Sequence, residues 1–259
     1  MTKILCIGDG HDEPWQKKDR WLWLGKFLVD KRPDIVVNIG DFITLDSLSA
    51  WDTDKRRKME MRRYDKEIQS GKEALAALWQ PAIEYNKYAK RRKKKAYIPT
   101  YIHLEGNHEE RAERYLDYNP HLEGKIDVYR DLELETYSAK WIKYRNYWVH
   151  NGIMFSHIPF QRNGRPLTGQ DLCRKALTLT NYSIIFGHSH RFGVDNVHRF
   201  GAKHLQQALN IGCYFEHQPD YVEGSPTDYW RGVVVLDNYK SHRFDIQTYS
   251  LSSIRSTYG

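Results

Sequence analysis

The chain has 259 residues and a formal net charge of +7, with 40 Lys plus Arg against 33 Asp plus Glu. This length can bury one sizeable core, and no apolar stretch approaches the roughly 20 residues of a membrane-spanning helix. The composition therefore excludes an integral membrane protein and favours one folded domain over residues 1–259.

Cysteine usage indicates the compartment. The three cysteines, Cys6, Cys173 and Cys213, are odd in number and lack the paired spacing of a thiolate metal site. Disulfides are rare in reducing compartments, so this pattern favours buried, reduced thiols in a cytoplasmic protein. A strand is predicted within the first four residues, and we therefore expect no export signal.

Five short apolar runs predict buried strands of an α/β sheet, and a polar motif follows each run. The runs are Ile4–Ile7, Ile35–Ile39, Tyr101–Leu104, Ile153–Ser156 and Ser183–Phe186. The polar residues that follow them are, in order, Asp9 and His11, Asp41, Asn107 and His108, His157, and His188 and His190. Open α/β sheets place their sites at strand ends, so we expect these side chains to meet.

These groups indicate metal-assisted hydrolysis. Carboxylate, imidazole and amide ligands favour Mn, Fe, Zn or Mg over metals that prefer thiolates. These eight side chains are too many for one ion, and two ions sharing a bridging carboxylate are the simplest interpretation. Two ions about 3.5–4 Å apart bind the attacking and leaving oxygens of an in-line displacement and generate hydroxide at neutral pH. We therefore expect hydrolysis of a phosphate ester; the alternative, that the residues only end strands, requires five coincidences.

Residues 51–98 form a basic segment, with 15 Lys plus Arg against seven Asp plus Glu. Its basic runs are Lys55–Lys58, Arg62–Arg63 and Arg91–Lys95. Good helix formers at Ala74–Trp79, followed by Pro81, predict two helices in an insertion or an extended crossover. The runs suit nucleic acid or another polyanion, solvated helix faces paired with local acids, or a dimer contact, and the sequence leaves these alternatives open.

Two further segments offer candidate substrate-binding arginines. Residues 110–115 predict a helix that begins beside the metal ligands, and Arg111 in it can reach a phosphate. Residues 161–165 predict a loop at the rim of the site, and Arg162 in it is a second candidate. Pairing with a nearby Glu, and plain surface exposure, are the respective alternatives.

Alternating runs at 194–200, 207–211, 232–236 and 243–249 predict a second sheet after the last metal motif. We expect His198, His204, His217 and His242, which lie in or beside these runs, to be structural or surface residues. Together with the early strands, the runs indicate an α/β fold of two mixed sheets with helices outside.

The motif series, in this order, resembles the calcineurin-like metallophosphoesterase superfamily over about residues 3–190. The resemblance implies an αββα sandwich and two ligand sets. Asp9, His11 and His190 would hold one ion, Asn107, His157 and His188 the other, and Asp41 would bridge them. It also implies that His108 contacts the substrate as general acid. Residues 210–213 and 230–236 resemble bacteriophage-encoded members.

One position departs from the family pattern. Many members carry an Asp three residues after the bridging Asp, and here that residue is Thr44. Asp46 is the nearest substitute. The form found in protein serine/threonine phosphatases is absent, although Gly106–Glu109 alone would fit them.

The sequence therefore ranks three functions. A phosphodiesterase or nuclease with two divalent ions comes first, with Mn as the leading choice and Fe, Zn or Mg as alternatives. A phosphomonoesterase acting on phosphoprotein or small esters is second, and a non-catalytic polyanion-binding module is last.

Overall fold

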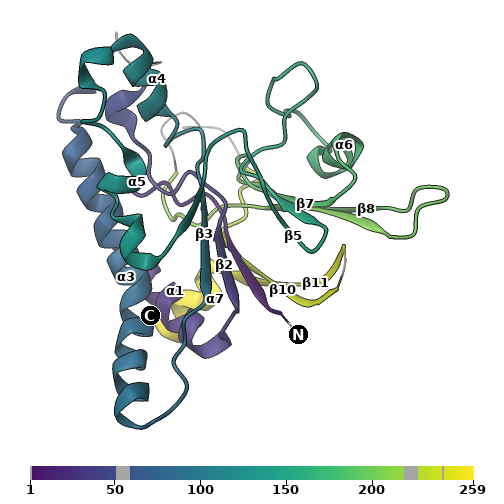
Figure 1. Ribbon diagram of the computed structural model, residues 1–259, viewed down its shortest axis with the longest axis horizontal. Coiled ribbons are helices and arrows are strands. Elements are labelled where there is room, and N and C mark those ends of the chain that lie inside the picture. Colours follow the sequence, from purple (N-terminus) through teal and green to yellow (C-terminus); the bar gives the residue numbers. More distant parts are fainter. Residues whose placement is uncertain (1, 51–58, 219–226, 241) are drawn as a thin grey trace.

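The computed structural model describes residues 2–50, 59–218, 227–240 and 242–259. Two β-sheets pack face to face, and helices cover both outer faces (Figure 1). The predicted αββα sandwich of two mixed sheets is confirmed.

The first sheet has the order β11-β10-β1-β2-β3-β4. Its strands are β1 (Ile4–Ile7), β2 (Ile35–Asn38), β3 (Thr100–Leu104), β4 (Lys140–Ile142), β10 (Gly232–Lys240) and β11 (Arg243–Ser250). The strands from β1 to β4 are parallel, and β10 runs antiparallel to β1.

The second sheet has the order β5-β6-β7-β9-β8. Its strands are β5 (Trp148–His150), β6 (Ile153–Phe155), β7 (Ser183–Phe186), β8 (Phe192–Val197) and β9 (Gln206–Ile211). The sequence suggested that the late strands form a second sheet of their own. This prediction is wrong, because these strands are divided between the two sheets. β10 and β11 join the first sheet because β10 pairs with β1, whereas β6 and β7 belong to the second.

Helices make up the outer layers. The α-helices are α1 (Asp19–Lys31), α3 (Tyr64–Arg91), α4 (Arg111–Tyr118), α5 (Val128–Asp131), α6 (Leu172–Leu179) and α7 (Leu251–Tyr258). Short 3-10 turns are η1 (Asp46–Leu48), η2 (Pro120–Leu122) and η3 (Leu134–Tyr137).

The alternation of side chains along the strands explains the layers. In β1, Leu5 and Ile7 pack with the helices α1, α3 and α7, while Ile4 and Cys6 enter the core between the sheets. In β7, Ile185 faces that central core, and its neighbours in the strand pack against α6. Because successive strand residues point to opposite faces, one strand serves two cores, and a strand buried on both faces, such as β1 or β7, is apolar along most of its length.

In the described part of the basic segment, residues 59–98, a long helix runs through Pro81, where the sequence predicted an interruption between two helices. Residues Tyr64–Arg91 form the continuous α3, which connects the parallel strands β2 and β3 as their crossover. Pro81 lies inside it, although an internal proline costs a helix about 3 kcal/mol. Its ring packs on α1, where a Cβ on Gly25 would lie 2.9 Å from Pro81 Cγ. This close packing of α3 on α1 offsets the missing hydrogen bond. Residues 51–58, with the run Lys55–Lys58, lie outside the described residues.

The three cysteines are buried and free, as predicted. Among the described residues, we find no helix with the length and apolarity to span a bilayer.

Candidate metal centre

The predicted ligands converge where the parallel strands end. The loops after β1 and β2 are joined by backbone bonds, with Gly10 N and His11 N donating to the Asp41 carbonyl at 2.8 and 2.9 Å. Gly187 N similarly donates to the His157 carbonyl at 2.9 Å, which joins the loops after β6 and β7. Every metal ligand predicted from the sequence is thereby brought into one region.

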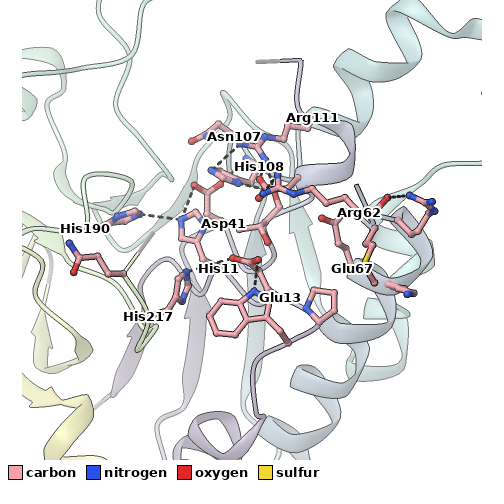
Figure 2. Close-up of a pocket in the computed structure, with 18 of the residues that line it drawn as sticks. His11, Glu13, Asp41, Arg62, Glu67, Asn107, His108, Arg111, His190 and His217 are labelled. Atoms are coloured by element: carbon pink, nitrogen blue, oxygen red, sulfur yellow. Dashed lines mark hydrogen bonds and ion pairs between the residues drawn. The ribbon is translucent and has the colours of Figure 1, made fainter. Parts of the chain in front are cut away.

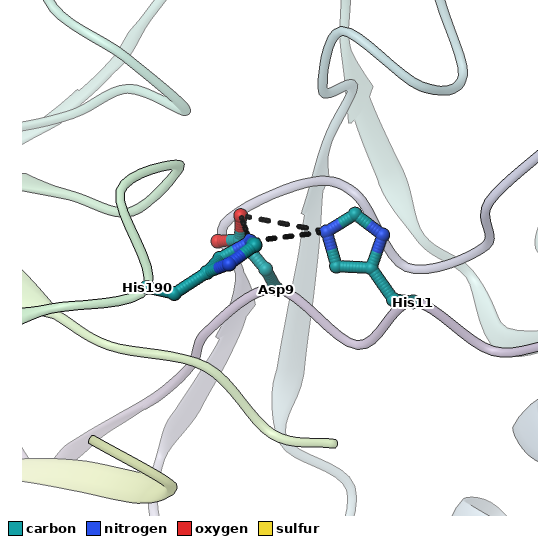
Figure 3. Close-up of side chains that lie close together, drawn as sticks. All are labelled: Asp9, His11 and His190. Carbon is teal, nitrogen blue, oxygen red and sulfur yellow. Dashed lines mark hydrogen bonds and ion pairs between the residues drawn. The ribbon is translucent and has the colours of Figure 1, made fainter. Parts of the chain in front are cut away.

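One cluster contains Asp9, His11 and His190, whose side chains point toward one another (Figure 3). His190 Nε2 lies 3.1 Å from Asp9 Oδ2 and 3.1 Å from His11 Nε2. All three residues are buried.

A second cluster contains Asp41, His157 and His188. His157 Nε2 lies 3.3 Å from Asp41 Oδ2, 3.3 Å from His188 Nδ1 and 3.0 Å from Asn107 Oδ1. Asp41 Oδ2 is also 3.8 Å from His11 Nε2, so this carboxylate lies between the two clusters.

The geometry of the donors fits cations. Ring nitrogens and carboxylate oxygens face one another at short range in a buried region, and such crowding of lone pairs is costly unless a proton or a cation lies between them. Asp9 Oδ2 is buried and accepts no hydrogen bond from the part of the chain that the structure describes. Nitrogen and oxygen donors of this kind suit Mn, Fe, Zn or Mg.

Backbone groups hold the outer side of the ligands. The other oxygens of the two aspartates accept backbone bonds, Asp9 Oδ1 from His188 N at 3.0 Å and Asp41 Oδ1 from His108 N at 2.8 Å. His157 Nδ1 lies 3.1 Å from the Ile39 carbonyl, which makes Nδ1 the donor and leaves Nε2 free for a ligand role. Asp9 Oδ2, Asp41 Oδ2 and His157 Nε2 are therefore oriented toward the two ligand clusters.

Two motif glycines make room for these carboxylates. A Cβ on Gly106 would lie 2.0 Å from Asp41 Oδ1, and a Cβ on Gly187 would lie 2.5 Å from Asp9 Oδ1. Any larger residue would displace the carboxylates, which explains why glycine precedes the Asn107 and His188 motifs.

Four of the ligand candidates have left-handed backbones. The φ angles are 41° at His11, 51° at Asp41, 67° at His188 and 59° at His190. Such conformations are unfavourable for non-glycine residues and persist only where the surroundings impose them. The loops therefore bend sharply just where each ligand leaves its strand.

Glu109 imposes one of these bends. This fully buried residue accepts four backbone N–H bonds, from Asp41, Phe42, Ile43 and Gly106, at 2.6–3.2 Å. Burial and then the neighbouring Asp41 raise the pKa of Glu109, whereas the backbone N–H groups of Gly106 and Ile43 lower it and stabilise the ionised carboxylate, both of whose oxygens act as acceptors. The sequence singled out Glu109 only as part of a motif, and its role in holding two loops together emerges from the structure.

Burial and charge act in opposite directions on the central pair. Burial favours neutral Asp41, but His157 and His108 outweigh it and hold the pKa of Asp41 well below its usual range. Burial likewise favours neutral His157, but Asp41 outweighs it and raises the pKa of His157 to about 9. Burial and the neighbouring His157 lower the pKa of His188 to about 4. These opposite shifts favour an ionised Asp41 beside a protonated His157, and a cation bound by the two side chains would displace the His157 proton.

His108 lies beside the ligands with a different set of contacts. Its Nδ1 donates to the Thr44 carbonyl at 2.8 Å, and its ring meets the His11 ring edge to face at 4.5 Å. Its Nε2 lies 3.5 Å from Arg111 Nη2. Burial lowers the pKa of His108, and Arg111 adds to the decrease. His108 also forms a candidate ligand group with His11 and Asp41, so proximity alone does not separate the two roles.

Asp46 does not orient His108. It pairs with two arginines, at 2.6 Å from Arg111 Nη1 and 2.8 Å from Arg62 Nη1. The acceptor for His108 is instead the backbone of Thr44, the residue at which the sequence departs from the family pattern. A carbonyl replaces the missing carboxylate.

A cavity of about 1190 Å³ opens beside these groups. The candidate ligands His11, Asp41, Asn107, His188 and His190 line it, together with His108 and Arg111. Figure 2 shows His190 and His217 on one side of His11 and Asp41, and Arg62 and Arg111 on the other. Arg162 lines a separate hollow with Asn163 and Lys175, and we leave it out of the proposed site.

Several cavity residues were missed from the sequence. Trp15, His217 and Tyr229 line the cavity, although His217 was expected to be structural or on the surface. No motif marks them. Trp15 alone had a usable signal, since it lies only four residues after His11.

The fold and the site together define the class of the protein: an αββα sandwich with a cluster of metal-ligand side chains at its strand ends. A family model described as calcineurin-like phosphoesterase matches residues 2–192. The chain therefore belongs to this family and is a metal-dependent hydrolase of phosphoric esters.

The chain is also similar to solved structures, all at low identity. Nuclease MPE from Pseudomonas putida has 11% identity and a TM-score of 0.36, covering 94% of this chain and 87% of that chain. Vps29 from Chaetomium thermophilum has 10% identity and a TM-score of 0.36, covering 96% and 97%. TT1561 of Thermus thermophilus has 9% identity and a TM-score of 0.38, covering 95% and 98%. No curated protein matches the chain significantly.

Proposed function

We propose that this protein is a phosphodiesterase or nuclease that hydrolyses phosphodiester bonds in nucleic acids or nucleotides. The observation that carries the proposal is the cavity beside the ligand clusters. Its volume of about 1190 Å³ exceeds that of most small-molecule sites, and Arg62, Arg63, Lys66 and Arg111 line it. Five acidic residues also line it, Glu13, Asp41, Asp46, Glu60 and Glu67, so the charge of its wall is mixed. A diester has a substituent on each side of its phosphate, and an open cavity of this size accommodates both.

We assign the ligands as two sets that share Asp41. Asp9, His11 and His190 would hold one divalent ion, and Asn107, His157 and His188 would hold the other. Mn is our leading choice, with Fe, Zn or Mg as alternatives. Such ions, when bound, polarise the phosphoryl oxygens and lower the pKa of water so that it can act as nucleophile.

The surrounding residues have their own roles in this proposal. With its Nδ1 proton donated to the Thr44 carbonyl, His108 directs Nε2 at the leaving oxygen, and in its imidazolium form it would give the Nε2 proton to that oxygen and return to the neutral form. Arg111 and Arg62, held side by side by Asp46, direct their remaining N–H groups to non-bridging phosphate oxygens.

Replacing His108 tests its role as general acid. We expect His108→Ala to lower kcat about 10²-fold or more for a diester with a nucleoside leaving group. The loss should be smaller when p-nitrophenol leaves, because that phenolate departs without a proton. Steady-state rates on both substrates, with metal content measured by elemental analysis, make the comparison. Equal losses on both substrates at unchanged metal content would contradict the assignment.

A phosphomonoesterase is the second candidate. The arginine pair that Asp46 holds can bind the dianionic end of a monoester as well as a diester, and the cavity does not exclude small esters. Only substrate preference separates the two activities.

The deciding experiment compares bis-p-nitrophenyl phosphate with p-nitrophenyl phosphate, using protein stripped of metal and reloaded with Mn. We expect a higher kcat/KM for the diester and its loss in Asp41→Asn, which removes the shared carboxylate charge. A preference for the monoester would replace our proposal with the phosphomonoesterase.

A further inference from the structure

An exposed tryptophan stands at the cavity. Trp15 lines it with 65% of its surface exposed, while most other large aromatic residues near the site are buried. A single exposed aromatic residue is ordinary on a protein surface, and Trp15 is distinguished by its position at the cavity and by the contacts that hold its ring.

The Trp15 ring is held in place. Its Nε1 donates to Glu13 Oε2 at 2.8 Å, and the ring meets His217 at 5.4 Å and 82°. His217 is fixed in turn, because Gln16 Nε2 donates to its Nδ1 at 2.8 Å. The Trp15 ring is therefore held through Nε1 and through its contact with His217, while most of its surface is accessible to solvent. Such a ring is preorganised for stacking, since it loses little conformational entropy on binding.

Aromatic contacts connect this ring to the metal centre. His11 contacts Phe215 at 5.4 Å between ring centroids, Phe215 contacts His217 at 4.8 Å, and His217 contacts Trp15. His217 lies on the opposite side of His11 and Asp41 from Arg62 and Arg111 (Figure 2). The cavity therefore has aromatic residues on one side of the candidate metal ligands and, on the other, two arginines that pair with Asp46.

We propose that Trp15, supported by His217 and Glu13, is the stacking subsite for the nucleobase of a nucleotide phosphodiester. This inference rests on the proposed phosphodiesterase function and adds a preference for nucleoside-containing diesters. Aromatic rings bind bases through their faces with little regard for sequence, so the subsite would accept any base. The arginines on the other side then contact the phosphate.

The kinetic test compares two diesters that release the same p-nitrophenol. Thymidine 5′-p-nitrophenyl phosphate contains a base, and methyl p-nitrophenyl phosphate does not. We expect Trp15→Ala to lower kcat/KM about tenfold for the thymidine substrate and to leave the methyl substrate within about twofold. Trp15→Phe should retain most of the preference. Phe200→Ala, which removes an exposed ring away from the cavity, should change neither rate.

A binding measurement gives a readout besides activity. Calorimetry on the Mn-loaded protein should show tighter binding of thymidine 5′-phosphate than of 2-deoxyribose 5-phosphate, and Trp15→Ala should abolish the difference. The subsite is overturned if the base gives no advantage, or if Trp15→Ala affects both ligands and both substrates equally. Failure of the proposed function looks different: neither diester is hydrolysed while p-nitrophenyl phosphate is, and the binding comparison then decides the subsite by itself.

Discussion

Glu109 shows how a single buried side chain controls the site. Each of its two carboxylate oxygens accepts two backbone N–H groups, so the loop after β2 and the turn after β3 are joined at one carboxylate. These bonds hold Asp41 in its left-handed conformation, with its Oδ2 directed at the ligand clusters.

Glu109→Gln should loosen this junction. A glutamine offers one acceptor oxygen, so two buried N–H groups would lose their partner and face an amide NH₂ instead. We expect the free energy of unfolding to fall by about 2 kcal/mol or more, and the Mn content after reloading to fall with it. Urea denaturation and elemental analysis test this. Full metal content at wild-type stability would show that Glu109 does not hold the loops.

His103 adds a dependence of stability on pH. Burial lowers the pKa of His103 to about 3, and its Nδ1 accepts a bond from the Tyr101 hydroxyl at 2.8 Å. In the unfolded chain a histidine binds a proton near pH 6.5. The unfolded state therefore binds more protons below that value. The stability that neutral His103 contributes is complete above pH 6.5 and is lost as the pH falls from there toward 3.

His103→Gln should flatten this dependence, because glutamine keeps an acceptor for Tyr101 but does not titrate. Between pH 7 and pH 5, we expect the wild type to lose about 2 kcal/mol more unfolding free energy than the variant. Urea denaturation at both pH values measures the difference. Parallel pH profiles for the two proteins would mean that His103 is protonated in the folded state.

At the scale of the elements, Asp12 connects the first ligand loop to two helices. Its fully buried carboxylate accepts bonds from Arg20 Nη2 at 3.0 Å and Trp21 Nε1 at 2.8 Å on α1, and from Ser70 Oγ at 2.6 Å on α3. Lys18 pairs with the same carboxylate. This network sets α1 and α3 against the loop that carries His11.

Asp12→Asn and Ser70→Ala should differ in severity. The first leaves the buried guanidinium of Arg20 without its counter-charge, and we expect a loss of about 3–5 kcal/mol of unfolding free energy. The second removes two hydrogen bonds, from Ser70 Oγ to Asp12 and from Lys18 Nζ to Ser70 Oγ, and should cost about 1–2 kcal/mol. Chemical denaturation of both variants provides the comparison, and equal effects would argue against a charge-based network.

At the scale of the molecule, the two basic runs that the structure describes, Arg62–Arg63 and Arg91–Lys95, lie at opposite ends of α3. α3 has 28 residues and therefore spans about 42 Å. Arg62 lines the cavity before the first turn of α3, whereas Arg91 ends its last turn and Arg92–Lys95 follow it. The chain just beyond them contacts the amino end of β2, where Tyr97 donates to the Pro33 carbonyl at 3.2 Å. The run Arg91–Lys95 thus lies near the amino ends of the parallel strands, at the opposite end of the sheet from the metal ligands.

The two ends should therefore respond differently to loss of charge. We expect Arg62→Gln to lower kcat/KM for bis-p-nitrophenyl phosphate about tenfold, through one lost charged hydrogen bond. Replacing Lys93, Lys94 and Lys95 together by Gln should leave that rate within about twofold, because a small diester cannot contact both ends. A comparable loss in both variants would refute this division of the basic segment.

Local patterns were sufficient for the strands and for the side chains that follow them. The five strands predicted before the ligand motifs all exist, as β1, β2, β3, β6 and β7, because a strand buried on both faces must be apolar along its length. A side chain that directly follows such a strand has its position determined by the strand. Predictions that depended on distant contacts were less successful: Pro81 did not divide α3, and β10 joined the first sheet.

The sequence by itself determined the class of chemistry, since the order of the Asp, Asn and His motifs at strand ends indicated metal-assisted hydrolysis of a phosphate ester. Only the tertiary structure decided what surrounds these motifs. Trp15, His217 and the two arginines beside Asp46 come from separate parts of the chain, and no spacing in the sequence relates them. The physical reason is that backbone geometry orders a strand and its next few residues locally, whereas a cavity forms only where packing brings distant loops together.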